Sequence, residues 1–175
     1  NLLAGRAFVL NLNPFTVSEI GQRFRLLDGL KWGMMPKVWS FDDEKDKQNF
    51  LRAYALTYLK EEIQEEQLLR KLSPFRQFLE IAAQTNGKIV NYSKIAKDVG
   101  VATQTVISYF SILEETLIGF TLAPYHRSLR KRQRQSPKFY LFDTGIKRAL
   151  DRTLDVGMNE RTYSFGDAFE HFVIL

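Results

Sequence analysis

The 175-residue sequence contains no cysteine, so disulfide bonds, thiolate metal ligands and a thiol nucleophile are all excluded. The absence of cysteine also fits a reducing compartment, and we expect a cytoplasmic protein. No apolar run in the sequence approaches the roughly 18 to 20 residues that a membrane-spanning helix needs. The N-terminus also lacks the basic and then apolar pattern of a signal peptide. We therefore expect no membrane partner.

Motifs that carry catalysis are absent as well. The sequence has no GxxxxGK[ST] phosphate-binding loop, no HExxH and no GxSxG, so we expect no ATP hydrolysis by this chain alone. Its two histidines, His126 and His171, lie far apart and show no metal-ligand spacing to acids, and we interpret both as structural. The acidic stretch FDDEKDK resembles the scattered acids and lysine of nucleases, but it falls in a predicted loop. The sequence thus predicts no catalytic residue, no metal and no cofactor in this chain.

Positive charge is concentrated in one segment. The formal net charge is +5, but residues 120–148 hold eight Lys or Arg against one acid, which gives this segment +7. The rest of the chain carries 17 basic and 19 acidic residues and is therefore slightly negative. A local excess of this kind indicates an anionic partner at one place rather than a generally basic surface.

The N-terminal part reads as a strand followed by a helix. Residues 7–12 form an apolar run that predicts a buried strand. Thr16 followed by Glu19 fits a capping box, which predicts a helix over residues 17–27 that stops at Gly29.

Two further helices are predicted before the centre of the chain. An apolar periodicity of three and four residues indicates a long helix over 47–72, with its glutamates on the solvent side. Ser73 and Pro74 suit the N-cap and first turn of the next helix, which ends near Gly87. Four residues of that helix are expected to be buried: Phe75, Phe78, Leu79 and Ala82.

A helix-turn-helix pattern follows in YSKIAKDVGVATQTVISYF. Asn91 can cap a short first helix, and Gly100 can supply the left-handed residue that ends it. The second helix has inward positions Val106, Phe110 and Leu113. Its outward N-terminal positions, the part that enters a major groove in this motif, include Thr103, Gln104 and Ser108. Its cap position is Ala102, which cannot bond the free amides.

Two predicted strands, TLIGFTLAP and KFYLFD, come next and are joined by a basic loop. Together with the helix pair they predict a winged helix, whose wing carries Arg127, Arg130, Lys131, Arg132, Arg134 and Lys138. Such a wing contacts DNA phosphates without sequence preference. A protein–protein or intramolecular docking module remains the alternative, because the outward positions of the second helix hold no Arg or Lys. Asp143 is expected to cap a helix over 144–150.

Several stretches, among them NLLAGRAFVLNLNPFTVSEI, KFYLFDTGIKRAL and GDAFEHFVI, resemble the later part of a prokaryotic AAA-type ATPase family. Members of that family have an ATPase core, a winged helix and a C-terminal domain of unknown function (the 4143 family). The most specific shared pattern is K-x-Y-x-x-D-x-G, formed here by Lys138, Tyr140, Asp143 and Gly145. The resemblance implies that a missing upstream part holds the Walker motifs and binds ATP and Mg. Because the chain starts and stops inside apparent elements, we interpret it as a fragment.

The resemblance also implies a layout. The expected fold is mainly α with a small β wing: the end of an ATPase-like core (1–46), a connector or lid helix (47–72), a winged helix-turn-helix (73–150) and the start of a truncated nuclease-like domain (151–175). The expected partner of the basic wing is DNA, and the partners of the alternative docking module are the protein's own ATPase core or a second copy of the chain.

Two single residues carry family expectations. Arg6 matches a family arginine that either approaches nucleotide phosphates or ties the last strand to the core. Glu170 matches the helix carboxylate that helps to bind a divalent metal in restriction-endonuclease-like nucleases, although the other ligands would lie beyond the end of the chain.

Overall fold

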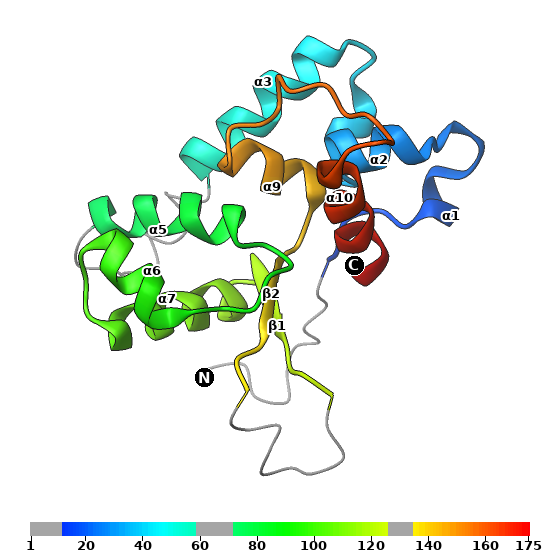
Figure 1. The fold of residues 1–175 in the computed structure, drawn as a ribbon. Helices are drawn as coiled ribbons and strands as arrows, with labels where there is room; N and C mark the ends of the chain where they lie inside the picture. The colour runs from blue at the N-terminus through cyan, green and yellow to red at the C-terminus, as the bar shows by residue number, and fades with distance from the viewer. Residues whose placement is uncertain (1–11, 59–71, 126–134) are drawn as a thin grey trace, which may run out of the picture.

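A computed structural model describes residues 12–58, 72–125 and 135–175. These residues fold mainly into helices around one small antiparallel sheet. Figure 1 shows helices α5, α6 and α7 on one side of the β1–β2 hairpin, and α1, α2 and α10 on the other. Helix α9 follows the end of β2, and α3 lies on the far side of α9 from the hairpin (Figure 1). The strand predicted at 7–12 lies outside the described residues except for its last position.

The first helical region is broken into short pieces, so the single helix predicted over residues 17–27 is wrong. Its elements are α1 (Val17–Ile20), a 3-10 turn (Gly21–Arg23) and α2 (Leu26–Trp32). The capping box is confirmed, since the Thr16 amide donates to the Glu19 carboxylate over 2.7 Å and the Thr16 hydroxyl accepts from the Glu19 amide. The break falls at Gly21, whose φ of +62° is incompatible with a continuing helix.

Gly29 does not end this region, because α2 continues past it to Trp32. A Cβ on Gly29 would lie only 3.0 Å from the Phe24 ring and 3.2 Å from the Phe172 ring. The glycine therefore serves close packing between α2 and α10 rather than helix termination.

Helix α3 (Glu44–Ala53) begins one turn earlier than the predicted start near Lys47. Glu44 lies in its first turn, where carboxylates interact favourably with the helix dipole, so part of the acidic stretch read as a loop is helical. The helix passes directly into a π-helical segment, Tyr54–Tyr58, beyond which the described residues end until residue 72. A further 3-10 turn, Val38–Ser40, precedes α3.

The central helices are α5 (Leu72–Gln84), α6 (Tyr92–Val99) and α7 (Thr103–Glu115). The four apolar residues predicted to be buried on α5 are buried. The Asn91 side chain accepts from the Lys94 amide, and Gly100 is left-handed with φ 74° and ψ 36°, which confirms both predicted ends of α6. Edge-to-face aromatic contacts hold the cluster together: the Phe110 ring lies 4.9 Å from those of Phe78 and Phe139.

The sheet consists of β1 (Gly119–Leu122) and β2 (Lys138–Leu141), paired antiparallel with Gly119 opposite Leu141. On the other edge of β2, Ile89 forms an isolated bridge to Lys138. The Gly87 amide also donates to the Phe139 carbonyl over 2.8 Å. The segment between α5 and α6 therefore runs along β2 as a short third strand-like piece. Two helices, α9 (Thr144–Leu150) and α10 (Tyr163–Ile174), complete the described chain.

No helix in the three described segments combines the length and the apolar character that crossing a bilayer demands.

Candidate nucleic-acid interface

The N-terminus of α7 presents polar side chains to solvent. Thr103, Gln104 and Ser108 are all exposed, while Val106 on the opposite face is fully buried. The cap residue Ala102 makes no side-chain hydrogen bond, as expected, so the first amides of the helix lack a side-chain acceptor. A helix end with this arrangement carries partial positive charge and favours an anion nearby.

The three polar residues differ in what they can still donate. The Ser108 hydroxyl donates to the Gln104 carbonyl oxygen over 3.1 Å, which leaves Ser108 only its acceptor capacity. The side-chain amide of Gln104 has no hydrogen-bond partner within the described parts of the chain. The Gln104 side chain therefore keeps its donors and its acceptor available to solvent at the exposed start of α7.

Two lysines on α6 add charge that the sequence analysis did not single out. Lys94 and Lys97 are exposed and lie three residues apart, so they share one face of α6. Helix α6 packs against α7. The i, i+3 spacing of the lysines in YSKIAKDV could have revealed this shared exposed face, because the inward positions of the helix were predicted from the same stretch.

All predicted wing cations except Lys138 lie outside the described residues, as does Arg6, so their roles stay predictions. They are Arg127, Arg130, Lys131, Arg132 and Arg134. The strands that lead to them are described: Leu122 pairs with Lys138, and the flanking Tyr125 and Gln135 are exposed.

Lys138 already has an anionic partner. Its Nζ lies 2.8 Å from Glu170 Oε1 on α10, and the Tyr140 hydroxyl donates to the same oxygen over 2.7 Å. The hydrogen bond from Lys138, followed by that from Tyr140, holds the pKa of Glu170 below its ordinary value, and Glu170 in turn raises the pKa of Lys138. Because both side chains are about half exposed, such a pair contributes about 0 to 1 kcal/mol.

The Glu170 carboxylate accepts hydrogen bonds from two side chains, and its part in a metal site stays a prediction. Its carboxylate oxygen is shared by Lys138 and Tyr140. Across the described residues, no group of three or more His, Cys, Asp or Glu side chains is arranged to hold a metal ion. The K-x-Y part of the resemblance pattern thus anchors β2 to α10.

Asp143 forms a buried junction between distant parts of the chain. Its Oδ1 accepts from the Ile146 amide over 3.0 Å, which confirms the predicted cap of α9. Its Oδ2 accepts from the Met34 amide over 2.7 Å, a contact across 109 residues that the sequence did not predict. Beside it, the Thr144 hydroxyl donates to the Gly29 carbonyl over 2.7 Å. We call Asp143, Thr144 and Gly145, with the α2 end they contact, the Asp143 junction.

Burial dominates the ionisation of Asp143. Removal from water raises the pKa of this carboxyl to about 6, although the amides of Met34 and Ile146 favour its charged form.

His171 is buried on α10, in agreement with the structural role expected for it. Its Nε2 lies 2.6 Å from the Leu141 carbonyl oxygen. Because a carbonyl oxygen can only accept, Nε2 carries the proton of a neutral ring. Burial lowers the pKa of His171 to about 4, so the ring stays neutral in the folded protein at neutral pH.

A His171→Gln variant is expected to change how stability depends on pH. The folded pKa of about 4 lies below the ordinary 6.5, so the unfolded chain binds more protons between these values and the wild type loses stability as the pH falls from 6.5 to 4. The lost contribution amounts to about 3 kcal/mol at full protonation. Urea unfolding at pH 7.5 and 4.5 should therefore show the wild-type advantage over His171→Gln shrinking at the lower pH. An advantage that is equal at both values would contradict a buried neutral imidazole.

Most of the chain matches one known protein family. The family model described as "Domain of unknown function (DUF8612)" matches residues 23–160. The chain belongs to this family. The DUF8612 match includes the α6–α7 pair, both strands and the Asp143 junction, and it ends before α10. Glu170 and His171 are therefore outside the matched region.

Two mycobacterial proteins resemble this DUF8612 chain over nearly its whole length. The uncharacterized proteins Mb2031c of Mycobacterium bovis and Rv2008c of Mycobacterium tuberculosis are each 27% identical to it over 172 residues. That alignment covers 98% of this chain but only 39% of either relative. No solved structure matches the chain.

Proposed function

We propose that residues 72–141 form a winged helix that contacts the DNA backbone and has no catalytic role of its own. The order of elements carries this proposal: α5, the bridge at Ile89, α6, α7, β1 and β2 follow one another as the helices and strands of a winged helix do. The exposed, uncapped N-terminus of α7 supports it, because that end enters a groove in this motif.

The distribution of charge supports backbone contact over base reading. Residues 127–134, with their five cations, lie between β1 and β2 in the sequence, where a winged helix has its wing. The surrounding segment 120–148 carries a net charge of +7. Lys94 and Lys97 add positive charge on α6, whereas the outward residues of α7 include no cation. We therefore expect nonspecific affinity with a steep dependence on salt, and Gln104 nearest the bases.

The proposal extends to the longer protein of which this chain would be a part. The resemblance to AAA-type ATPases, together with relatives more than twice as long as the chain, supports an upstream core that binds ATP and Mg. The absence of cysteine fits a cytoplasmic protein. Residues 1–46 would then end that core, with Arg6 near its nucleotide or its last strand. Residues 151–175 would begin a nuclease-like domain, in which Glu170 would be the first acid.

Charge-neutral replacement of four wing cations should weaken binding of a DNA duplex. In a variant with Arg130, Lys131, Arg132 and Arg134 changed to Gln, the slope of log K against log salt should become shallower by about 0.9 for each phosphate that the variant no longer neutralises. Fluorescence anisotropy of a labelled duplex over a salt series measures both slope and affinity.

The matched control removes the same charge elsewhere, with Gln at four exposed positions of the N-terminal helices and turns: Arg23, Arg25, Lys37 and Lys45. This control should retain most of the wild-type slope. An unchanged slope and affinity in the wing variant would exclude the proposed DNA contact.

A docking module is the second candidate, favoured by apolar side chains exposed near the end of the chain. Phe169, Val173 and Ile174 on α10 are 44%, 65% and 38% exposed, and Leu26 and Leu27 on the neighbouring α2 are also exposed. A cavity of about 530 Å³, walled by Phe120, Phe142 and Phe172 among others, opens close by. Light scattering discriminates, since a mass that rises with concentration, together with a salt slope unaffected by the wing changes, supports docking to a second copy.

A further inference from the structure

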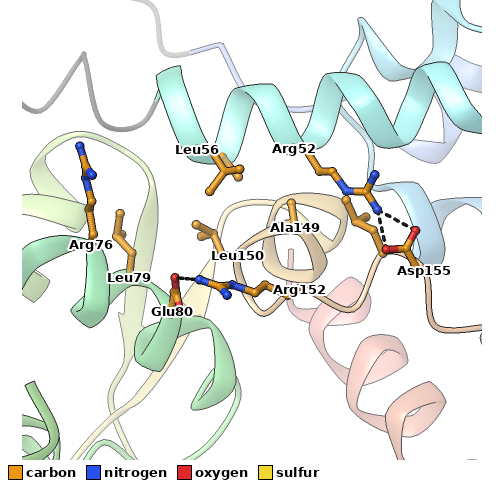
Figure 2. Close-up of a pocket in the computed structure, with 11 residues that line it drawn as sticks. Arg52, Leu56, Arg76, Leu79, Glu80, Ala149, Leu150, Arg152 and Asp155 are labelled. Carbon is orange, nitrogen blue, oxygen red and sulfur yellow. Dashed lines mark hydrogen bonds and ion pairs between the residues drawn. The ribbon is translucent and has the colours of Figure 1, made fainter. Parts of the chain in front are cut away.

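A pocket of about 620 Å³ lies away from the α7 surface, between three separate parts of the chain (Figure 2). Helix α3 and its π-helical extension form one wall, α5 forms another, and α9 with the turn that follows it forms the third. The lining is mainly apolar and includes Leu56, Leu79, Leu150 and Leu154. The volume is in the range of sites that hold small organic molecules.

Two backbone irregularities meet at this pocket. The π-helical segment Tyr54–Tyr58 places Leu56 on the wall, and this side chain is 59% exposed although it is apolar. Arg152 on the opposite wall has a φ of +61°, and Leu117 is the other non-glycine residue with positive φ in the described chain. π-Helical turns and left-handed side-chain-bearing residues are both unfavourable locally and are enriched at functional sites. The presence of both irregularities at one pocket indicates a ligand-binding site.

Three arginines border the apolar lining. Arg52 Nη2 contacts both Asp155 carboxylate oxygens, and Arg152 Nη2 lies 2.5 Å from Glu80 Oε1. Figure 2 shows these pairs at separate edges of the apolar lining, with Arg76 on α5 beside it. Arg76 is exposed and has no acidic partner among residues 12–58, 72–125 and 135–175, so the charged residues of the lining sum to +1.

The two ion pairs can yield to an incoming anion. Arg152 and Glu80 side chains are 72% and 39% exposed, and pairs in such contact with water contribute little to stability. Because Arg76 lies one helical turn before Glu80 on α5, an anion that reaches Arg76 can also take the Arg152 guanidinium from Glu80 at small cost. A planar guanidinium suits carboxylate and phosphate alike.

We propose that this pocket binds an amphipathic organic anion, whose carboxylate or phosphate lies on Arg76 and Arg152 and whose alkyl or aryl body lies against Leu56, Leu79 and Leu150. The site is separate from the DNA contact proposed above. It uses no residue of α6, α7 or the hairpin.

Isothermal titration calorimetry with decanoate, decyl phosphate and decanol tests the proposal. Both anions should bind at least about tenfold more tightly than decanol, because only they engage the arginines. Whichever of decanoate and decyl phosphate binds more tightly identifies the head group. Equal binding of decanol and the anions, or no binding of any of the three, would overturn the proposal.

Variants locate the site. Arg76→Gln should weaken decanoate and decyl phosphate about tenfold and leave decanol unchanged, whereas Arg161→Gln, an exposed arginine outside the pocket, should change nothing. Leu56→Gln should weaken all three ligands. Arg152→Gly removes the left-handed strain together with the guanidinium, so it should weaken the anions without lowering the melting temperature. If Arg76→Gln and Arg161→Gln behave alike, the anion does not bind here.

Discussion

The Asp143→Ala variant is expected to lose about 3 to 5 kcal/mol of its free energy of unfolding. The carboxylate is 1% exposed and accepts from the Met34 and Ile146 amides, so alanine leaves two donors without an acceptor inside the protein. Each buried unsatisfied donor costs about 1 to 3 kcal/mol, and the Ile146 amide is the one that Asp143 caps at the start of α9, so these two donors account for the loss. Urea unfolding followed by tryptophan fluorescence and circular dichroism measures the loss.

Two companion variants show whether the loss comes from the junction. Asp143→Asn keeps one acceptor oxygen and should lose clearly less than alanine. Asp98→Ala, at an exposed position on α6, should stay within about 0.5 kcal/mol of the wild type. A loss below about 1 kcal/mol for Asp143→Ala would mean that the junction does not hold α2 to α9.

The cost of Asp143→Ala should also depend on pH. The folded pKa of about 6 lies above the ordinary 3.8, so the native protein binds more protons between these values and the wild type gains stability as the pH falls from 6 to 4. The alanine variant lacks this gain, and its deficit should widen below pH 6. This trend is opposite to that expected for His171→Gln, so the two variants separate contributions that nearly cancel in the wild type.

Gly145→Ala is expected to cost about 3 kcal/mol or more through steric overlap. A Cβ at this position would lie well inside contact distance of the Trp32 carbonyl group. Because the neighbour is backbone, it cannot rotate away as a flexible side chain would, and α9 must separate from α2. Thermal unfolding followed by circular dichroism should show a correspondingly lower midpoint.

Gly166→Ala is the matched control. Gly166 lies in α10 with open space around its missing Cβ, so alanine should be neutral or stabilise the protein by up to about 1 kcal/mol. Equal midpoints for the two alanine variants would show that α2 and α9 do not approach each other as closely as described.

Local hydrogen bonding is what the sequence predicted well. The caps at Thr16, Asn91 and Asp143 were predictable because each joins a side chain to an amide three residues away. The break at Gly21 and the helical Gly29 were not, since a glycine can either end a helix or admit a neighbour, and only packing against Phe24 and Phe172 decides. The link from Asp143 to Met34 depends on tertiary structure alone.

The candidate site residues likewise divide into those predictable from a local sequence pattern and those that only the tertiary fold reveals. Periodicity was enough to predict that Thr103, Gln104 and Ser108 face outward, because the buried positions of α7 define its other face. The attachment of Lys138 to Glu170 joins two elements distant in sequence and required the fold. The arginine-bordered pocket has walls from three separate segments, so no local pattern could reveal it.

The connection between the hairpin and the rest of the molecule is very short. Strand β2 ends at Leu141, and only Phe142 separates it from Asp143, whose carboxylate accepts a hydrogen bond from the Met34 amide. A force along β2, exerted by whatever the hairpin binds, therefore reaches the C-terminal end of α2 directly through the Asp143 carboxylate.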